Sequence, residues 1–178
     1  VRPADLVLSR SGDNLIIGIS GTTDQVTIVD QFKTTRQSVD NHDRIETFAF
    51  ADGTNWTAAD IDKAILLQST TSGSETIIGY DSDDEFQASA GNDTLRGLLG
   101  NDTFNFGRGS GADTIDDNPT ATLGSESTAD KVVFGENVLA SNLVLSRVGS
   151  DLVIGIAGTS DQLTISGQLT INVQGSPY

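Results

Sequence analysis

The stretch that decides the fold runs from Thr70 to Asn105 and reads TTSGSETII, GYDSDDEFQ, ASAGNDTLR, GLLGNDTFN, four units of nine residues. Each unit has an acid in sixth place and a large apolar residue in eighth place; the acids are Glu75, Asp84, Asp93 and Asp102. Glycine is fourth in three units, and Ser82 replaces it in the second. Four units in one phase predict a regular repeating coil.

The period of nine fits a coil built from short strands and tight turns. About three residues form a strand of ~10 Å and the other six reverse the chain, so two units complete one coil. Stacked strands lie ~4.8 Å apart, and two oxygens that are each ~2.4 Å from one calcium ion are separated by the same distance. The acid before each strand is therefore a candidate calcium ligand. Glycine lets the turn adopt positive φ and direct its carbonyls inward.

Two pairings follow from this stacking: Asp84 with Asp102, and Glu75 with Asp93. After Asn105 the frame shifts, and FGRGSGADTI (106–115) supplies a further acid beyond Asp93. We expect one to three Ca2+ ions, with the strongest site at Asp84 and Asp102. The expected ligands, side chains and backbone carbonyls together, are Glu75, Gly79, Asp81, Asp84, Gly91, Asp93, Gly97, Leu99, Gly100, Asp102, Gly109 and Asp113. The alternative is a metal-free coil in which the Gly-Asn-Asp turns only reverse the chain.

The eighth position of each unit predicts the interior of the coil. Phe86 and Phe104 should stack on one strand face, and Ile77 and Leu95 should stack on the opposite strand. Large apolar side chains at these positions would fill the narrow space between the two rows of strands.

A second, longer repeat frames the array. Residues 6–28 read LVLSRSGDNLIIGISGTTDQVTI and residues 143–165 read LVLSRVGSDLVIGIAGTSDQLTI, with an offset of 137 and 16 identities in 23 positions. Each copy holds three short apolar runs separated by turns rich in Gly and Asp, which is typical of strands. Their spacing fits either a continued coil or a small antiparallel sheet. The repetition and the absence of an initial Met indicate a segment of a longer array.

One helix is expected. Thr57 to Asp60 resembles a capping box, with Asp in place of Glu, and predicts a helix that runs to about Leu67. Its expected apolar residues are Ile61, Ala64, Ile65 and Leu67. The fold class is therefore all-β, a parallel β-roll flanked by short-stranded β segments with one short helix near 57–67. We expect three parts: the C-terminal part of one β unit (1–69), the calcium-binding roll (70–117) and the start of the next unit (118–178).

These motifs resemble RTX exoproteins, in which haemolysin-type calcium-binding nonapeptides (GGxGxDxUx) lie beside a related flanking domain. The resemblance rests on DLVLSRSGDNLIIGISGTTDQVTI (5–28), FADGTNWTAADI (50–61) and GNDTFNFGRGSGADTI (100–115), and with the nonapeptides it covers nearly the whole chain. It implies a secreted bacterial protein, extracellular or at the cell surface, which a type I system exports and which folds on meeting calcium. Members of this family often carry Asp where this chain has Ser110, which implies weaker binding at that loop.

Composition agrees with a calcium-dependent fold. The formal net charge is −15, and residues 73–117 contain ten acids and two bases. Such a segment resists compaction until cations neutralise it. No basic patch is present, so we expect no nucleic-acid partner. The chain has no Cys for a disulfide framework, and no apolar stretch is long enough for a transmembrane segment.

The sequence contains few of the residue patterns that are typical of catalytic sites, and we expect no enzyme activity. His42 is the single histidine, and its polar Asn-His-Asp-Arg turn predicts a solvated side chain. No G-x-S-x-G occurs, and Gly-Arg-Gly-Ser-Gly (107–111) lacks the Lys-Ser/Thr pair of a phosphate loop. Residues 81–85 begin like an EF-hand, yet Phe86 occupies the position that requires glycine.

Two hypotheses about function remain. The favoured one is a calcium-induced folding and structural module of a large secreted RTX protein, of adhesin or toxin type, with neighbouring repeat units of the same chain as partners. The alternative is a substrate- or glycan-binding accessory module of a secreted RTX enzyme. A glycan or cell-surface target would require an exposed aromatic platform, for which Trp56, Tyr80 and Tyr178 are the candidates.

Overall fold

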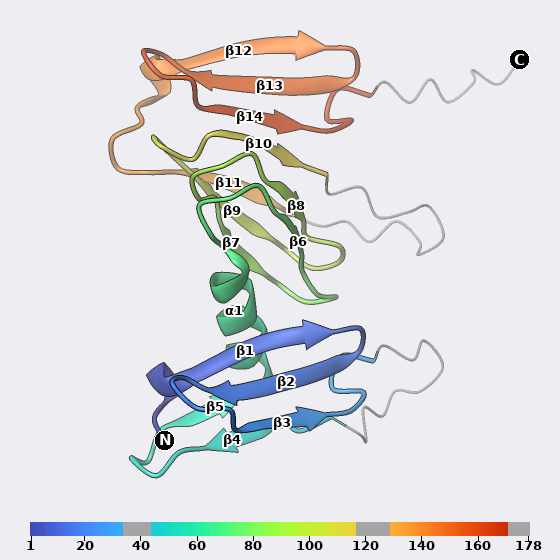
Figure 1. The fold of residues 1–178 in the computed structure, drawn as a ribbon. Helices are drawn as coiled ribbons and strands as arrows, with labels where there is room; N and C mark the ends of the chain where they lie inside the picture. The colour runs from blue at the N-terminus through green and yellow to red at the C-terminus, as the bar shows by residue number, and fades with distance from the viewer. Residues whose placement is uncertain (34–43, 117–128, 171–178) are drawn as a thin grey trace, which may run out of the picture. The chain divides into compact units, whose positions relative to one another are not determined.

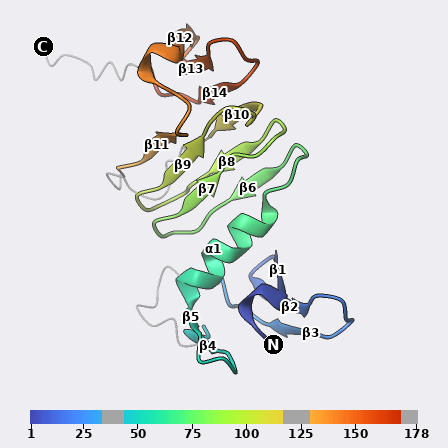
Figure 2. The ribbon, with the colours of Figure 1, turned by 90° about the vertical axis from the view of Figure 1, so that its left-hand side faces the viewer.

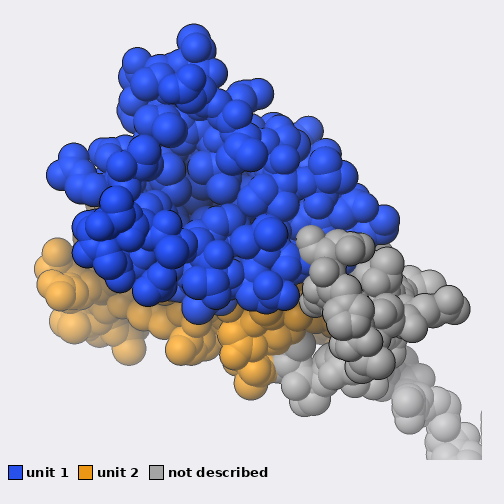
Figure 3. Space-filling model, turned by 90° about the horizontal axis from the view of Figure 1, so that it is seen from below, with its two compact units in different colours: residues 1–69 blue, residues 70–178 orange. Residues whose placement is uncertain are grey.

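The computed structural model describes residues 1–33, 44–116 and 129–170. The chain divides into two compact units, residues 1–69 and 70–178, which Figure 3 distinguishes by colour. His42 and Tyr178 lie outside the described residues, so the expectations for them stay predictions.

The first unit holds a three-stranded sheet, a hairpin and one helix (Figure 1). After a short 3-10 turn at Pro3–Asp5, β1 (Leu6–Ser11), β2 (Asn14–Ile19) and β3 (Gln25–Ile28) pair antiparallel in chain order. Residues 6–28 therefore form a small sheet of their own. β4 (Thr47–Ala49) and β5 (Asn55–Thr57) form the hairpin, where Trp56 packs edge-on against Phe50 with 5.3 Å between ring centroids.

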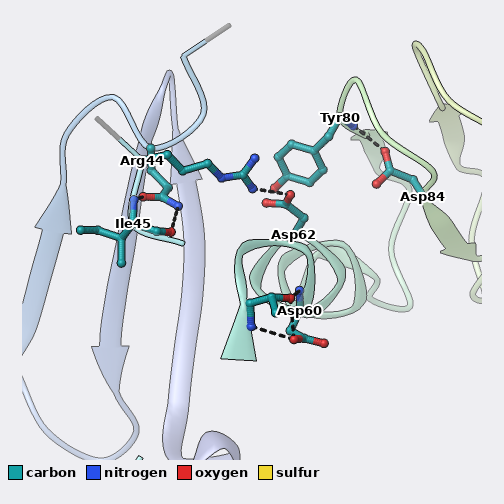
Figure 4. Close-up of polar contacts among 8 residues, drawn as sticks. Arg44, Ile45, Asp60, Asp62, Tyr80 and Asp84 are labelled. Carbon is teal, nitrogen blue, oxygen red and sulfur yellow. Dashed lines mark hydrogen bonds and ion pairs between the residues drawn. The ribbon is translucent and has the colours of Figure 1, made fainter. Parts of the chain in front are cut away.

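The helix α1 (Ala58–Ser69) begins at a reciprocal cap. The Thr57 amide donates to Asp60 Oδ2 at 2.8 Å, and the Asp60 amide donates to Thr57 Oγ1 at 3.3 Å (Figure 4), so the expected capping box is confirmed. Ile61, Ile65 and Leu66 are buried, whereas Leu67 is 62% exposed. The prediction was wrong at Leu67, because at ~100° per residue it falls outside the stripe that the buried positions share.

Two polar contacts fasten residues 44–45 within this unit (Figure 4). Arg44 Nη2 lies 2.6 Å from Asp62 Oδ2, and burial raises the pKa of Asp62 above its ordinary value although the guanidinium opposes this. The buried Gln31 side chain donates to the Ile45 carbonyl and accepts from the Ile45 amide, both at 2.9 Å. These contacts pair the buried Gln31 amide and one oxygen of Asp62, while Arg44 Nε and Asp62 Oδ1 have no hydrogen-bond partner among the described residues.

The second unit begins with a parallel β-roll (Figures 1 and 2). One sheet contains β6 (Thr76–Ile78), β8 (Thr94–Arg96) and β10 (Ala112–Ile115); the other contains β7 (Glu85–Gln87), β9 (Thr103–Phe106) and β11 (Lys131–Phe134). Successive strands alternate between the two sheets. Thr76 lies opposite Thr94 and Glu85 opposite Thr103, so the expected stacking of residues 18 apart is confirmed.

The interior of the roll also matches its prediction. The rings of Phe86 and Phe104 are stacked, with centroids 5.0 Å apart and planes 10° apart, and Ile77 lies opposite Leu95. All four side chains are at most 4% exposed. Full burial of one such side chain contributes ~1.5–3 kcal/mol, so this row is a main source of apolar stabilisation.

The second copy of the long repeat closes one end of this roll. After a 3-10 turn at Ala140–Asn142, β12 (Leu143–Val148), β13 (Asp151–Ile156) and β14 (Gln162–Ile165) pair antiparallel. β14 also pairs in parallel with β10, with Asp113 opposite Leu163. The result is a six-stranded sheet in the order β12-β13-β14-β10-β8-β6, and Figure 1 shows β12, β13 and β14 in succession above β10.

Candidate calcium sites

Acids stack in two columns at the start of the roll strands. The first column lies at the N-terminal ends of β6, β8 and β10 and consists of Glu75, Asp93 and Asp113. The second lies at the N-terminal ends of β7, β9 and β11 and consists of Asp84, Asp102 and Asp130. Asp161 precedes β14 directly and lies against Gly111, because Gln162 pairs with Ala112, so it sits beside the first column but two residues out of register with Asp113. The regular acid spacing of the sequence thus becomes two lines of carboxylates in space.

Backbone amides join consecutive acids within each column. In the first column, Asp93 Oδ1 accepts from the Glu75 amide and Asp113 Oδ1 accepts from the Asp93 amide, both at 2.9 Å. In the second column, Asp102 Oδ1 and Asp130 Oδ1 accept from the preceding acid in the same way, again at 2.9 Å. Each bond fixes one carboxylate oxygen, which holds the carboxylates in line along the roll.

Asp113 shows the electrostatic character of the first column. Its side chain is 1% exposed, and its Oδ2 is buried with no hydrogen-bond partner among the described residues. Burial raises the pKa of Asp113 to about 6; the Asp93 amide opposes this rise, and the nearby charges of Asp93 and Asp161 add to it. Glu75 Oε2 is likewise buried without a hydrogen-bond partner among the described residues. Buried carboxylate oxygens without donors are unfavourable unless a cation compensates them.

Asp161 is held differently from the other acids. The amides of Gly109 and Gly111 donate to its two carboxylate oxygens, both at 3.0 Å, and the two glycines have φ of 85° and 89°. Although burial acts to raise it, these amides lower the pKa of Asp161 below its ordinary value. The ionised carboxylate therefore holds the loop that leads into β10 against the start of β14. We call this contact of Asp161 with the Gly109 and Gly111 amides the latch.

Glycines allow the loops of the first column to approach closely. A methyl group at Gly91 would collide with the Gly73 carbonyl, and one at Gly111 would collide with the Gly91 carbonyl. Both glycines have positive φ, 134° at Gly91 and 89° at Gly111. The lack of a side chain thus brings backbone oxygens of one loop against the next loop.

The second column has the same close approach. A methyl group at Gly79 would collide with Asp84 Oδ2 and lie 2.9 Å from the Gly97 carbonyl oxygen. A methyl group at Gly100 would lie 2.5 Å from the Ser82 carbonyl oxygen. The amide of Tyr80 donates to Asp84 Oδ2 (Figure 4), which turns that carboxylate back over its own loop.

The contacts bring together ten of the twelve expected ligand residues. Five acids are joined in the two columns, and five glycines contact an acid or a neighbouring loop: Glu75, Asp84, Asp93, Asp102, Asp113, Gly79, Gly91, Gly97, Gly100 and Gly109. Asp81 is exposed and Leu99 half-buried, and their role as carbonyl donors stays a prediction. Ser110 is buried and its hydroxyl accepts from the Gly107 amide at 3.1 Å, so it stabilises the exit loop from within.

Sequence reasoning missed Asp130 and Asp161. Asp130 follows Asp102 by 28 residues and Asp161 follows Asp113 by 48 residues, so a search at the nonapeptide spacing does not find them. A usable signal is an acid followed two residues later by an apolar strand residue. Asp130-Lys131-Val132 and Asp161-Gln162-Leu163 share this pattern with Asp93-Thr94-Leu95.

The residues present fit calcium. No three His, Cys, Asp or Glu side chains gather closely enough to hold an ion by themselves in the part of the chain that the structure describes. A site here must therefore combine carboxylates from two loops with backbone carbonyls, which are the oxygen ligands that Ca2+ takes. The buried Oε2 of Glu75 and Oδ2 of Asp113 and the closely packed carbonyls of Gly73 and Gly91 are oxygen atoms of this kind.

Two family matches agree with this geometry. Residues 14–60 match the haemolysin-type calcium binding protein related domain, and residues 69–104 and 78–115 match the RTX calcium-binding nonapeptide repeat, which comprises four copies. A search of curated proteins found no match. RTX nonapeptide repeats bind Ca2+. With an array of these repeats beside the related domain, the protein is an RTX calcium-binding chain.

Proposed function

We propose that the chain is a calcium-induced folding and structural module of a large secreted bacterial RTX protein, of adhesin or toxin type. The observation that carries this proposal is the buried, hydrogen-bond-deficient Oδ2 of Asp113 within a column of acids. RTX repeats are typical of secreted proteins, and the repeat array is a structural module without catalytic function. Within the described ranges, no helix has the length and apolar character needed to cross a membrane.

The acid columns couple folding to calcium. Residues 73–117 carry ten acids and two bases, and the fold places the acids of each column next to one another. Bound calcium would neutralise this charge and join successive loops. Export through a type I system would then deliver an extended chain, and folding would follow in the calcium of the exterior.

The proposal places up to three ions between consecutive acids. The first lies between Asp84 and Asp102, with carbonyls of residues 79, 81, 97 and 99; the others lie between Glu75 and Asp93 and between Asp93 and Asp113. The division into a related β unit (1–69), a roll (70–117) and the start of a second unit (118–178) is part of the same proposal. Residues 1–69 and 118–178 would then connect successive rolls within one polypeptide.

Calorimetric titration of calcium into the intact chain tests the assignment. Asp102 is 1% exposed in the middle of its column, whereas Glu75 is half-buried at the start of the other. Asp102→Ala should therefore lower the affinity of one site by at least about tenfold, more than Glu75→Ala does. Glu136→Gln, at an exposed position outside both columns, is the matched control. No loss from Asp102→Ala would overturn the site assignment, and equal losses would overturn the ranking.

Among the described residues, the two aromatic candidates Trp56 and Tyr80 give no support to a glycan-binding function. Trp56 packs against Phe50, and Tyr80 is 9% exposed, so neither ring forms an open platform. We propose that the whole chain, like the repeat array, has a structural role. We expect it to have no catalytic activity of its own. The calcium module is therefore the function that we propose.

A further inference from the structure

The two copies of the long repeat have the same internal structure. β1, β2 and β3 pair in the same registers as β12, β13 and β14, at the sequence offset of 137. In the first copy the Ser20 amide donates to the Asp5 carbonyl at 2.8 Å, and in the second the Ala157 amide donates to the Asn142 carbonyl at 2.8 Å. The sequence repeat is thus a structural repeat, and differences between the copies report their surroundings.

The third strand of each copy has very different surroundings. In the second copy, β14 pairs with β10, Leu163 is 1% exposed and Asp161 is 7% exposed. In the first copy, the equivalent Val26 is 54% exposed and Asp24 is exposed. Among the described residues, β3 pairs with β2 alone, so its outer edge has no strand partner there.

The turn that presents the acid is nevertheless built identically. The Asp161 amide donates to Thr159 Oγ1, and the Asp24 amide donates to Thr22 Oγ1, both at 3.1 Å. The strand that follows reads Gln-Leu-Thr-Ile in the second copy and Gln-Val-Thr-Ile in the first. The first copy therefore retains the carboxylate that a latch requires, in a preformed turn, and the apolar strand residue two positions later.

We propose that β3 is a docking edge for the last strand of another nonapeptide roll, joined in tandem in the same polypeptide. The docked strand would run parallel to β3 in the register that β10 adopts on β14. Asp24 would accept from the two glycine amides of the incoming exit loop, as Asp161 accepts from Gly109 and Gly111. This inference rests on the proposed function, since the partner is itself a calcium-loaded roll.

A nonapeptide roll is the partner that this edge fits best. A parallel strand brings its preceding loop alongside Asp24, because the acid also precedes its own strand. The exit loop of the roll in this chain presents two amides from glycines with positive φ, a concave donor arrangement that suits a carboxylate. The apolar end of a roll interior would then cover Val26, as Leu163 is covered here.

A tandem chain tests the inference. In this tandem chain, a second copy of residues 70–137 is placed directly before Val1. Val1 aligns with Val138 at the offset of 137, so the added roll is joined to the first copy of the long repeat in the same way as the existing roll is joined to the second copy. Amide hydrogen exchange in calcium is measured at residues 25–28 in the tandem and original chains. We expect exchange at β3 to slow by at least about tenfold in the tandem chain, towards the rates of β14. Calcium uptake, measured in parallel, reports whether the added roll has formed.

A matched variant shows whether the latch itself is responsible. Asp24→Lys in the tandem chain should restore fast exchange at β3 while the original roll still binds calcium. Unchanged exchange at β3 beside a calcium-loaded added roll would overturn the docking proposal and leave the proposed function intact. Protection that depends on protein concentration would also overturn it, because the partner would be another molecule. Absence of calcium uptake by both rolls would instead refute the proposed function.

Discussion

The two copies of the long repeat are covered along opposite edges of the same three-stranded sheet. In the second copy the β14 side is covered, with Leu163 1% exposed, while Leu145 on β12 is 64% exposed. In the first copy the β1 side is covered, with Leu8 4% exposed against α1, while Val26 on β3 is 54% exposed. Each copy thus has one covered edge and one exposed edge: β14 is covered in the second copy, and β1 is covered in the first.

The difference shows that the surroundings of a copy, rather than its sequence, decide which side chains it buries. Leu8 and Leu145 are the same residue at equivalent positions, yet among the described residues Leu8 is buried on a strand that packs against α1, whereas Leu145 is exposed. The Gln68 side chain of α1 accepts from the Leu8 amide at 2.7 Å and donates to the Leu6 carbonyl at 3.3 Å, which fixes the helix along β1. A sheet of three short strands needs such partners, because it cannot bury enough apolar surface by itself.

The largest difference should appear at the third strand. Leu163→Ala should destabilise the calcium-loaded second unit by about 3 kcal/mol, because it leaves a cavity at the closed end of the roll. The equivalent Val26→Ala should change the stability of the first unit by less than about 0.5 kcal/mol. Local opening free energies from hydrogen exchange measure both effects separately. Equal effects would show that β3 is covered in solution.

The first strand should show the reverse preference. Leu8→Ala should destabilise the first unit by about 2 kcal/mol, since the side chain is buried between β1 and α1. Leu145→Ala should have an effect of less than about 1 kcal/mol on the second unit. Exchange rates in β1 and β12 compare the two variants. A larger loss at Leu145 would contradict the assignment of partners.

Substitutions at Asp161 and at the equivalent Asp24 should differ by a smaller amount in their effect on stability. Asp161→Asn removes the charge and one of the two amide acceptors, so the pairing of β14 with β10 should weaken by about 1–2 kcal/mol. Asp24→Asn should be nearly neutral in this chain, because its carboxylate is exposed. Exchange at the Gly109 and Gly111 amides provides the readout. Slow exchange that persists in Asp161→Asn would show that the latch contributes little.

The smallest effect concerns pH. The pKa of Asp113 is raised to about 6, so its proton competes with calcium below that pH, and calcium affinity should fall by about tenfold from pH 7 to pH 5. In the calcium-free state, the folded roll keeps the Asp113 proton up to a pH of about 6, whereas the unfolded chain releases it above the ordinary pKa of 3.8. The stability of the calcium-free roll therefore falls as the pH rises from 3.8 to about 6.

Titrations at pH 5, 6 and 7 in buffers with different ionisation enthalpies measure both the affinity and the number of protons released. Proton release near pH 6 that disappears in Asp113→Asn would support the assignment. Calcium affinity that is constant from pH 5 to pH 7 would contradict it. The first copy has no acid column, so the stability of the β1–β3 sheet should not follow this transition.

The contacts within the nonapeptide roll could be predicted from the sequence, whereas the contacts between the roll and the β12–β14 sheet could not. Phase and spacing predicted the stacking of Phe86 on Phe104 and the pairing of Asp84 with Asp102, because a coil of fixed period repeats its contacts. Asp161 escaped prediction because its place beside Asp113 depends on how a distant antiparallel sheet docks. Leu66 was missed for a similar reason. Helical periodicity shows which residues can share a face, but the elements packed against the helix decide which face is buried.

The most direct test of calcium-coupled folding is amide hydrogen exchange on the intact chain, in millimolar calcium and in excess chelator. Chelation should accelerate exchange in β6 to β11 and in the β14 edge by at least about 100-fold, while exchange in β1 and β2 should change by less than about threefold. Calcium should restore protection and magnesium should not, because its short octahedral shell fits this spacing poorly. Continued protection of β6 to β10 in excess chelator would contradict calcium-coupled folding.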